Sequence, residues 1–245
     1  MPIHLARRAC GLTALLAVAA LAVAGCEADP AKSASEPPAP PALPAAPAPA
    51  SRPLTAAELV AAALPGEESP EAYGHPVSVR KTRAGDRKSE VSDAACEQLL
   101  AAVHARRPSR PAPAVVEQTF NWKNDMNGGN STLASYGNSG AVAVFAEVRE
   151  GLSTCRYYES PAPAPTMTYK GTVTGAPAPQ LGDEAVQFEI TAPTEMGPHV
   201  TQYTVVRTGS VVVTFTKLSV GGLDPREFPP ALIAQQISRL QQAQR

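Results

Sequence analysis

Side chains able to bind a metal ion or to transfer a proton are sparse in this chain of 245 residues. Three histidines follow residue 25, namely His75, His104 and His199, and no two of them have the spacing of a pair of metal ligands. The sequence contains no H-E-x-x-H and no C-x-x-C motif, the spacings typical of zinc sites. We therefore predict no metal site and no cofactor, and we expect the three histidines to have structural roles at the surface.

Two acidic segments come closest to a site. Residues 125–130 (DMNGGN) look like part of a calcium loop, but Tyr136 stands where such a loop requires a late acidic ligand. Asp183 and Glu184 are adjacent, so on a strand they would point to opposite faces and could not act together as acid and base. We instead expect a turn in which Gly182 has a positive φ and Asp183 accepts hydrogen bonds from local amides.

Motifs for nucleophilic or phosphate chemistry are missing as well. The sequence has no G-x-S-x-G motif and no phosphate-binding P-loop. Ser135 and Ser139 have no base near them in the sequence, although catalytic triads are assembled only in space. We predict that the protein is not an enzyme, and a hydrolase with a spatially assembled site is the least favoured alternative.

The N-terminus has the three parts of a secretory signal peptide. The first eleven residues carry two adjacent arginines and no acid, residues 12–23 are apolar apart from one threonine, and small residues follow. The apolar run is shorter than the ~20 residues that span a bilayer as a helix. The tetrad Val23-Ala24-Gly25-Cys26 resembles the lipobox of bacterial lipoproteins, which implies cleavage before Cys26 and a lipid on that cysteine. An ordinary signal peptide is the alternative, and the arginine pair leaves twin-arginine export open.

The remaining cysteines predict one disulfide. Cys10 leaves with the signal peptide and Cys26 carries the lipid, so Cys96 and Cys155 are left in an exported chain, where disulfides persist. A bond between them would close a loop of about 60 residues and stabilise the fold by about 4 kcal/mol in the chain-entropy description. Two buried free thiols are the alternative.

A linker is predicted between the lipid site and the folded part. Residues 26–53 are rich in Ala and Pro, a composition that cannot bury a core and favours an extended, disordered polyproline form. Residues 54–245 are long enough for one domain with its own core. The whole chain has a formal charge of −1 and gives no case for a clustered basic surface, so we predict no nucleic-acid partner.

Hydrophobic periodicity predicts both helices and strands within residues 54–245. Helices are expected at residues 55–64 with Thr55 and Glu58 as a capping box, at 93–103 with Asp93 as N-cap, from 141 to just before Cys155, and at 229–242. Strands are expected at residues 76–83, 115–122, 132–136, 168–173, 184–191, 201–208 and 210–217, with a loop at 160–165 and a tight turn at Thr208-Gly209. In residues 115–122 the even-numbered side chains should share one face. Together these elements predict an α+β fold, one globular domain with a mainly antiparallel sheet flanked by helices.

The order of short motifs along the folded part resembles a known family. The motifs are LTAAEL at 54–59, LPG at 64–66, CEQL at 96–99, LASY at 133–136, the helix ending in Cys155, LGDEAV at 181–186, VVRTG at 205–209 and a closing helix rich in glutamine. This order is similar to that of the PknH-like extracellular sensor domain, which occurs on mycobacterial receptor kinases and on many actinobacterial lipoproteins. The resemblance implies an antiparallel sheet flanked by helices, a cleft for an unidentified ligand, and no catalytic residues. The kinase sensor has two disulfides where this chain can form one, which leaves the shape of the cleft open.

The sequence therefore predicts a lipid-anchored extracytoplasmic lipoprotein of the cell membrane, with a non-catalytic, sensor-like ligand-binding domain. Trp122, Tyr203 and Phe215 are the candidate ligand-cleft residues, and a cleft lined by them on an open sheet face would favour this function. A sheet face fully covered by helices would favour the alternative, a structural or protein-interaction lipoprotein of the cell envelope. The predicted partners are the membrane, through the lipid anchor, and either an unknown small ligand or an envelope protein.

Overall fold

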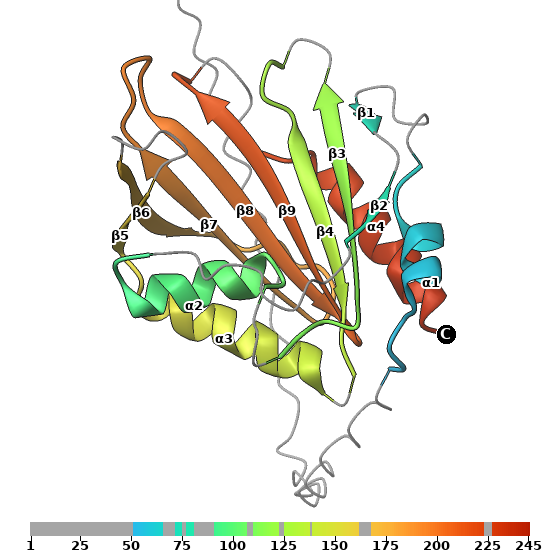
Figure 1. Ribbon diagram of the computed structural model, residues 1–245. Coiled ribbons are helices and arrows are strands. Elements are labelled where there is room, and N and C mark those ends of the chain that lie inside the picture. Colours follow the sequence, from blue (N-terminus) through green and yellow to red (C-terminus); the bar gives the residue numbers. More distant parts are fainter. Residues whose placement is uncertain are drawn as a thin grey trace, which may run out of the picture. The chain divides into compact units, whose positions relative to one another are not determined.

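The computed structural model describes residues 51–65, 72–74, 77–80, 91–106, 110–122, 125–137, 139–161, 168–222 and 227–245. The predicted signal peptide, Cys26, most of the predicted linker and His75 lie outside these residues. The described residues belong to one compact unit and form four helices and a nine-stranded sheet with antiparallel pairing (Figure 1). The predicted α+β fold is confirmed, while the limits of the domain stay a prediction.

Helices and strands alternate in groups along the described part of the chain. The helices are α1 (Ala56–Ala62), α2 (Ala94–Val103), α3 (Gly140–Thr154) and α4 (Pro230–Ala243). The strands are β1 (Ala72–Gly74), β2 (Ser78–Val79), β3 (Ala114–Trp122), β4 (Gly129–Ser135), β5 (Tyr157–Pro161), β6 (Thr168–Ala176), β7 (Glu184–Ala192), β8 (His199–Thr208) and β9 (Val211–Val220). None of the helices in this part of the chain is both long and apolar enough to cross a membrane.

The last strand joins two groups of strands into one sheet. The strand order is β1-β3-β4-β9-β8-β7-β6-β5, with β2 also paired to β3, so β9 lies between the β3–β4 hairpin and the β6–β8 strands. Thr208 pairs with Val211, which leaves Gly209 and Ser210 as a two-residue turn with a φ of 55° at Gly209. The predicted hairpin of the last two strands is therefore confirmed. Glycine permits the tight turn, because it accepts this left-handed backbone without strain.

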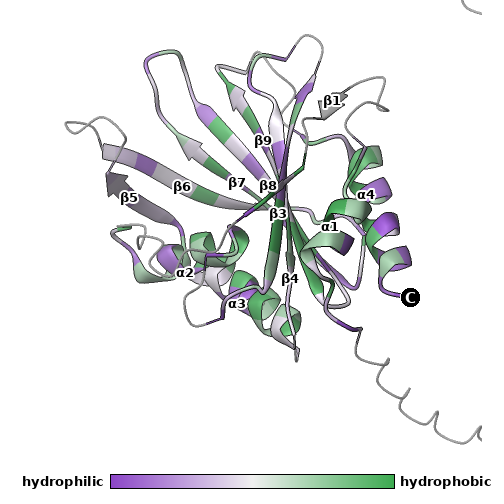
Figure 2. Cartoon of the chain, turned by 45° about the vertical axis from the view of Figure 1, so that its right-hand side comes forward, coloured by the Kyte–Doolittle hydropathy of each residue, from purple (hydrophilic) through white to green (hydrophobic). Residues whose placement is uncertain are grey.

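Helices cover both faces of the sheet, and each pair of helices has its own core. Figure 2 shows α2 and α3 against one face and α1 and α4 against the other. The first core, the α2/α3 core, contains Leu99 and Phe145, and the second, the α1/α4 core, contains Leu59 and Ile237. Strand β3 contributes to both, because successive side chains of a strand point to opposite faces. Its even-numbered Val116 and Phe120 lie in the α1/α4 core and Val115 in the α2/α3 core, as the predicted alternation requires.

Helix α1 is too short to be stable alone and is held by polar contacts. The capping box forms as predicted, since the Thr55 hydroxyl accepts from Glu58 N and Glu58 Oε2 accepts from Thr55 N. The buried side chain of Gln236 on α4 then accepts from Leu64 N at 3.1 Å and donates to Ala62 O at 2.8 Å. Leu64 O also accepts from Gln118 of β3 at 2.8 Å, so both neighbouring elements hold the end of α1.

Two strand predictions need correction. β2 covers only Ser78–Val79 where the sequence predicts a longer strand, and residues 81–90 lie outside the described part. β5 covers Tyr157–Pro161, where the sequence predicts no strand and a loop from residue 160. A strand with one buried side chain, Tyr158, gives almost no periodic signal, and its terminal proline is tolerated because β5 is an edge strand.

Candidate functional site

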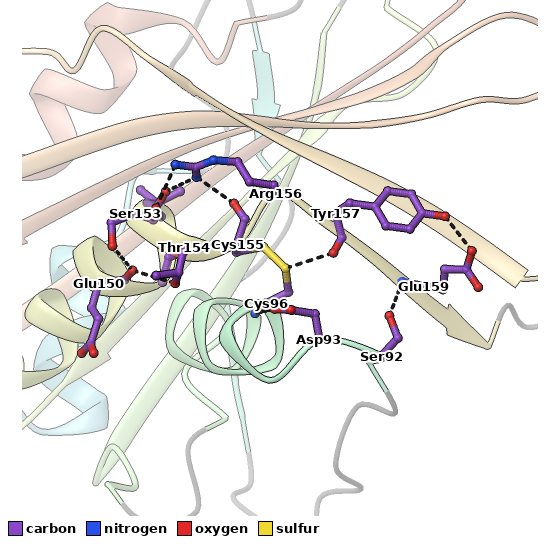
Figure 3. Close-up of a disulfide and its surroundings, with 12 residues drawn as sticks. Ser92, Asp93, Cys96, Glu150, Ser153, Thr154, Cys155, Arg156, Tyr157 and Glu159 are labelled. Atoms are coloured by element: carbon purple, nitrogen blue, oxygen red, sulfur yellow. Dashed lines mark hydrogen bonds between the residues drawn. A yellow bond between two sulfur atoms is a disulfide. The ribbon is translucent and has the colours of Figure 1, made fainter.

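The predicted disulfide lies where the two covering helices of one face meet (Figure 3). Cys96 and Cys155 are bonded, with their Cα atoms 4.8 Å apart, and both are fully buried. Asp93 caps α2 by accepting from Cys96 N at 2.9 Å, as predicted. At Gly151 of α3 an added Cβ would lie 2.8 Å from Leu99 Cβ, so the absence of a side chain lets α3 approach α2. The bond and this close approach make the α2–α3 pair one unit.

Besides the disulfide, hydrogen bonds hold the end of α3 and the start of α2 near the edge of the sheet at β5 (Figure 3). The Arg156 guanidinium donates to Leu152 O at 2.7 Å and to Ser153 O at 2.8 Å, which satisfies carbonyl groups at the end of α3. Ser92 N donates to Glu159 O at 2.9 Å, and the Ser92 hydroxyl accepts from Glu159 N at 2.8 Å. The outer edge of β5 is therefore partly paired by the segment before α2.

The three candidate cleft residues do not line one cleft. Trp122 packs against the α1/α4 core and Phe215 belongs to it, with the ring of Phe228 5.3 Å and 5.0 Å from their rings. Tyr203 belongs to the α2/α3 core, where its ring is stacked on Phe188 at 4.8 Å. The prediction of a shared cleft is wrong, because Tyr203 pairs with Thr216 and Phe215 is one residue away, on the opposite face.

Asp125 forms a buried ion pair instead of opening a calcium loop. Its Oδ2 lies 2.8 Å from Lys217 Nζ, and the two side chains are 3% and 1% exposed. Its Oδ1 accepts from Asn127 N and Gly128 N, which closes the β3–β4 turn, and Lys217 Nζ lies 5.6 Å from the centre of the Trp122 ring. Among the residues that the structure describes, no group of three or more His, Cys, Asp or Glu could hold a metal ion.

His104 lies at the end of α2 rather than free at the surface. Its ring meets the Tyr203 ring edge to face at 5.9 Å, and its carbonyl oxygen accepts from Arg80 at 2.6 Å. Burial lowers the pKa of His104 to about 4, with the charges of Arg106 and Arg80 acting in the same direction. The imidazole is therefore neutral and belongs to the packing of the α2/α3 side. His199 is half-buried, with its ring 6.4 Å from that of Tyr169.

An open cavity of about 880 Å³ lies at the end of the sheet that carries the β8–β9 turn. Its walls come from residues 51–53, the start of α3, the β8–β9 turn and the end of α4. The lining is charged at Arg52, Asp183, Arg207 and Arg245 and apolar at Pro53, Ala141 and Val142. None of the described residues that line it is a His, Cys or Lys, and its walls offer hydrogen bonds, charges and apolar contacts.

One wall contains a cluster of charged side chains, called the clip, in which Arg207 binds both Asp183 and Glu184. Arg207 Nε lies 2.6 Å from Glu184 Oε2, its Nη1 lies 2.7 Å from Asp183 Oδ2, and that oxygen also accepts from Gly209 N at 2.7 Å. Gly182 has a φ of 63°, as expected, and an added Cβ there would meet Arg207 O at 2.4 Å. The expectation that Asp183 caps local amides is wrong, because the amide it binds belongs to a turn 26 residues away. The clip brings the LGDEAV and VVRTG segments of this chain together.

A second part of the lining joins the start of the described chain to α4. Gln244 Oε1 accepts from Ser210 N at 2.9 Å and its Nε2 donates to Thr208 O at 3.1 Å. The Ser210 hydroxyl donates to Arg52 O at 2.7 Å. A hydrogen bond from the Arg52 guanidinium, together with hydrogen bonds from Thr55, lowers the pKa of Glu58 to about 2, so this surface pair stays charged. Sequence reasoning missed Arg52, Arg207 and Gln244, and only Arg207 lay in a motif that singled it out.

These features define the class of fold. It is an α+β domain whose antiparallel sheet has helices on both faces, with a disulfide between two of the helices and a cavity at one end of the sheet. The fold resembles that of the extracellular domain of PknH from Mycobacterium tuberculosis, with a TM-score of 0.53 and 13% sequence identity over 78% of this chain and 96% of that one. A Rv0999 ortholog from Mycobacterium smegmatis aligns with a TM-score of 0.35 and 13% identity, over 71% of this chain and 88% of that one. No family model matches the chain, and no curated protein matches it. The likeness to the PknH domain establishes the fold and nothing beyond it.

Proposed function

We propose that this protein is a lipid-anchored extracytoplasmic lipoprotein whose PknH-like fold binds a small ligand in the cavity at the β8–β9 turn. The cavity carries the proposal: at about 880 Å³ its volume lies within the range of small-molecule sites, about 300–1,000 Å³. Charged and apolar groups face it together, which suits recognition of a ligand with both kinds of surface. The matching PknH domain is described as extracellular, which supports the same location for this fold.

The anchor is proposed from the N-terminal sequence. Cleavage before Cys26 and acylation of its sulfur would leave the domain on a tether of Ala and Pro residues, and more than one acyl chain is needed for durable anchoring. Cys26→Ser should release the protein from the membrane fraction or leave the precursor uncleaved, as judged by fractionation and mass spectrometry. Normal cleavage with membrane retention of this variant would rule the anchor out.

A cell-envelope interaction protein is the second candidate, and a specific observation favours it. Tyr203 and Phe215 lie under helices on opposite faces, so the aromatic cleft expected of a ligand-binding module is not formed by these residues. The proposed ligand site therefore rests on the cavity alone. Catalysis is not proposed, because the carboxylate among the described lining residues, Asp183, is already bound to Arg207 and to Gly209 N.

Filling the cavity separates the two candidates. Val142 lines the cavity and is half exposed, so Val142→Trp should occupy the space without disturbing either core. Val60→Trp on α1 is the matched control, because Val60 is similarly exposed and does not line the cavity. Protein isolated from its own cells should release a small molecule on denaturation, and Val142→Trp should lose it while Val60→Trp keeps it, measured by mass spectrometry. Absence of any released molecule, or equal amounts from both variants, would favour the interaction protein.

A further inference from the structure

A buried ion pair lies under the only tryptophan of the chain. Lys217 of β9 and Asp125 of the β3–β4 turn have side chains that are 1% and 3% exposed, with Lys217 Nζ 2.8 Å from Asp125 Oδ2. Gly129 of β4 pairs with Lys217, and an added Cβ at Gly129 would lie 2.8 Å from Trp122 Cη2. The absence of a side chain at Gly129 therefore lets the Trp122 ring lie close to the sheet, with Lys217 Nζ 5.6 Å from its centre.

The hydrogen bonds of this group are incomplete within the described part of the protein. Trp122 Nε1 is buried and donates to no described residue. Asp125 Oδ2 is also buried and accepts no hydrogen bond, so its contact with Lys217 is an ion pair without hydrogen-bond geometry. Lys217 Nζ donates to Leu218 O at 2.6 Å, which uses one of its three protons. An unused donor and an unused acceptor therefore lie near the same ammonium group.

Charge and hydrogen bonding together select what can satisfy these atoms. The charges of Lys217 and Asp125 balance, so neither a further cation nor an anion is favoured beside them. The occupant has to accept from the indole N–H and donate to the carboxylate oxygen. Water does both, and it is the usual partner of buried polar groups that a protein leaves unsatisfied.

We propose that an ordered internal water molecule accepts from Trp122 Nε1 and donates to Asp125 Oδ2, with Lys217 Nζ as its third partner. Buried water molecules usually have two to four polar partners, so this set is sufficient. A buried ion pair stabilises a fold only where further hydrogen bonds satisfy its remaining donors and acceptors, which is the role of the water here.

This water site is separate from the cavity. Lys217 pairs with Gly129 at the start of β4, whereas the other end of β4 pairs with Val211 beside the β8–β9 turn. The proposal therefore does not depend on the ligand proposed for the cavity.

The first measurement uses the intact wild-type protein, labelled with nitrogen-15 and purified in detergent. Trp122 is the only tryptophan, so its indole N–H gives one resonance that needs no further assignment. A bound water molecule gives NOE and ROE cross peaks of opposite sign between water and this proton, whereas exchange with bulk solvent gives cross peaks of the same sign. We expect opposite signs. No cross peak with water, or two cross peaks of the same sign, would overturn the proposal.

The second measurement follows the oxygen of water, because protons of the Lys217 ammonium exchange with solvent and can relay an NOE. Oxygen-17 relaxation dispersion reports how many water molecules stay inside a protein for a long time. Trp122→Phe keeps an aromatic ring and removes the donor, so it should lower the dispersion amplitude by about one water molecule. Tyr157→Phe is the matched control and should leave the amplitude unchanged, because the Tyr157 side chain is 46% exposed and its hydroxyl donates to Glu159 at the surface.

Circular dichroism and thermal melting check that both variants are folded. Equal dispersion amplitudes of Trp122→Phe and the wild type would contradict the proposal. The cross peaks of the wild type require no substitution, so they decide the matter even where Trp122→Phe does not fold.

Discussion

The two faces of the sheet are each covered by a pair of helices, but different chemistry holds each pair in place. On the α2/α3 side a disulfide joins the helices, and Gly151 lets them touch. On the α1/α4 side the contacts between the described helices are noncovalent, and the buried amide of Gln236 binds the end of α1. A disulfide stabilises a fold mainly by lowering the conformational entropy of the unfolded chain. A buried amide stabilises it through hydrogen bonds that exist only while its partners are in place in the folded state. Loss of the disulfide should therefore lower the stability of the whole domain, whereas loss of the amide should act on the α1/α4 side, where its partners lie.

The largest expected effect comes from removing the disulfide. Cys96→Ala with Cys155→Ala should lower the free energy of unfolding by about 4 kcal/mol, because a loop of about 60 residues is no longer closed in the unfolded chain. Urea unfolding followed by circular dichroism measures the change. Trp122 is the only tryptophan of the chain and packs on the α1/α4 side, so its fluorescence in the native variant should match the wild type. An unchanged unfolding midpoint, or altered native fluorescence, would contradict this division between the faces.

A smaller effect is expected on the other face from Gln236→Ala. The change leaves the buried Leu64 N without its side-chain partner, while Ala62 O keeps the hydrogen bond from Arg239 Nε, and we expect a cost of about 2 kcal/mol. Gln235→Ala, at the neighbouring exposed position, is the control and should change stability by less than about 0.5 kcal/mol. Chemical denaturation of both variants gives the comparison. Equal stabilities of the two variants would show that the amide contacts do not hold α1.

The third effect is absent at neutral pH, appears only as the pH falls, and lies on the α2/α3 side. The pKa of His104 is about 4 in the fold against 6.5 as its ordinary value, so the unfolded chain binds a proton more readily. This contribution to stability is complete above pH 6.5 and is lost as the pH falls towards 4. His104→Gln should therefore lose less stability than the wild type over that interval, as measured by urea unfolding at a series of pH values. Parallel pH profiles of the two proteins would be the contrary result.

Local features of this chain were readable from the sequence, and long-range pairings other than the disulfide were not. The capping box of Thr55 and Glu58, the alternation in β3 and the Cys96–Cys155 bond were all predicted, because each depends on neighbouring residues or on a count of cysteines. The prediction of a shared cleft was wrong because Tyr203 lies on the opposite face of the sheet from Trp122 and Phe215. A difference of one residue in the strand register moves a side chain to the other face.

The cavity could not be predicted for a related reason. Its walls combine residues 51–53 with Gln244 and with the turn at Gly209, and no local pattern indicates that these segments meet. The partner of Asp183 was missed because hydrogen-bonding distance depends on the fold and not on separation along the chain. The positive φ at Gly182, in contrast, was predicted because it is a property of a short turn.

The position of Arg52 beside the β8–β9 turn has a consequence for how the domain can be joined to other polypeptide segments. Arg52 O accepts from Ser210 while Gln244 binds the same turn, so the two ends of the described fold lie side by side. A domain with adjacent ends can be attached through either end, or inserted into a longer polypeptide, without rearrangement of its sheet. This architecture is portable: the same sheet can be attached to other polypeptide segments through the residues before α1 or those after α4.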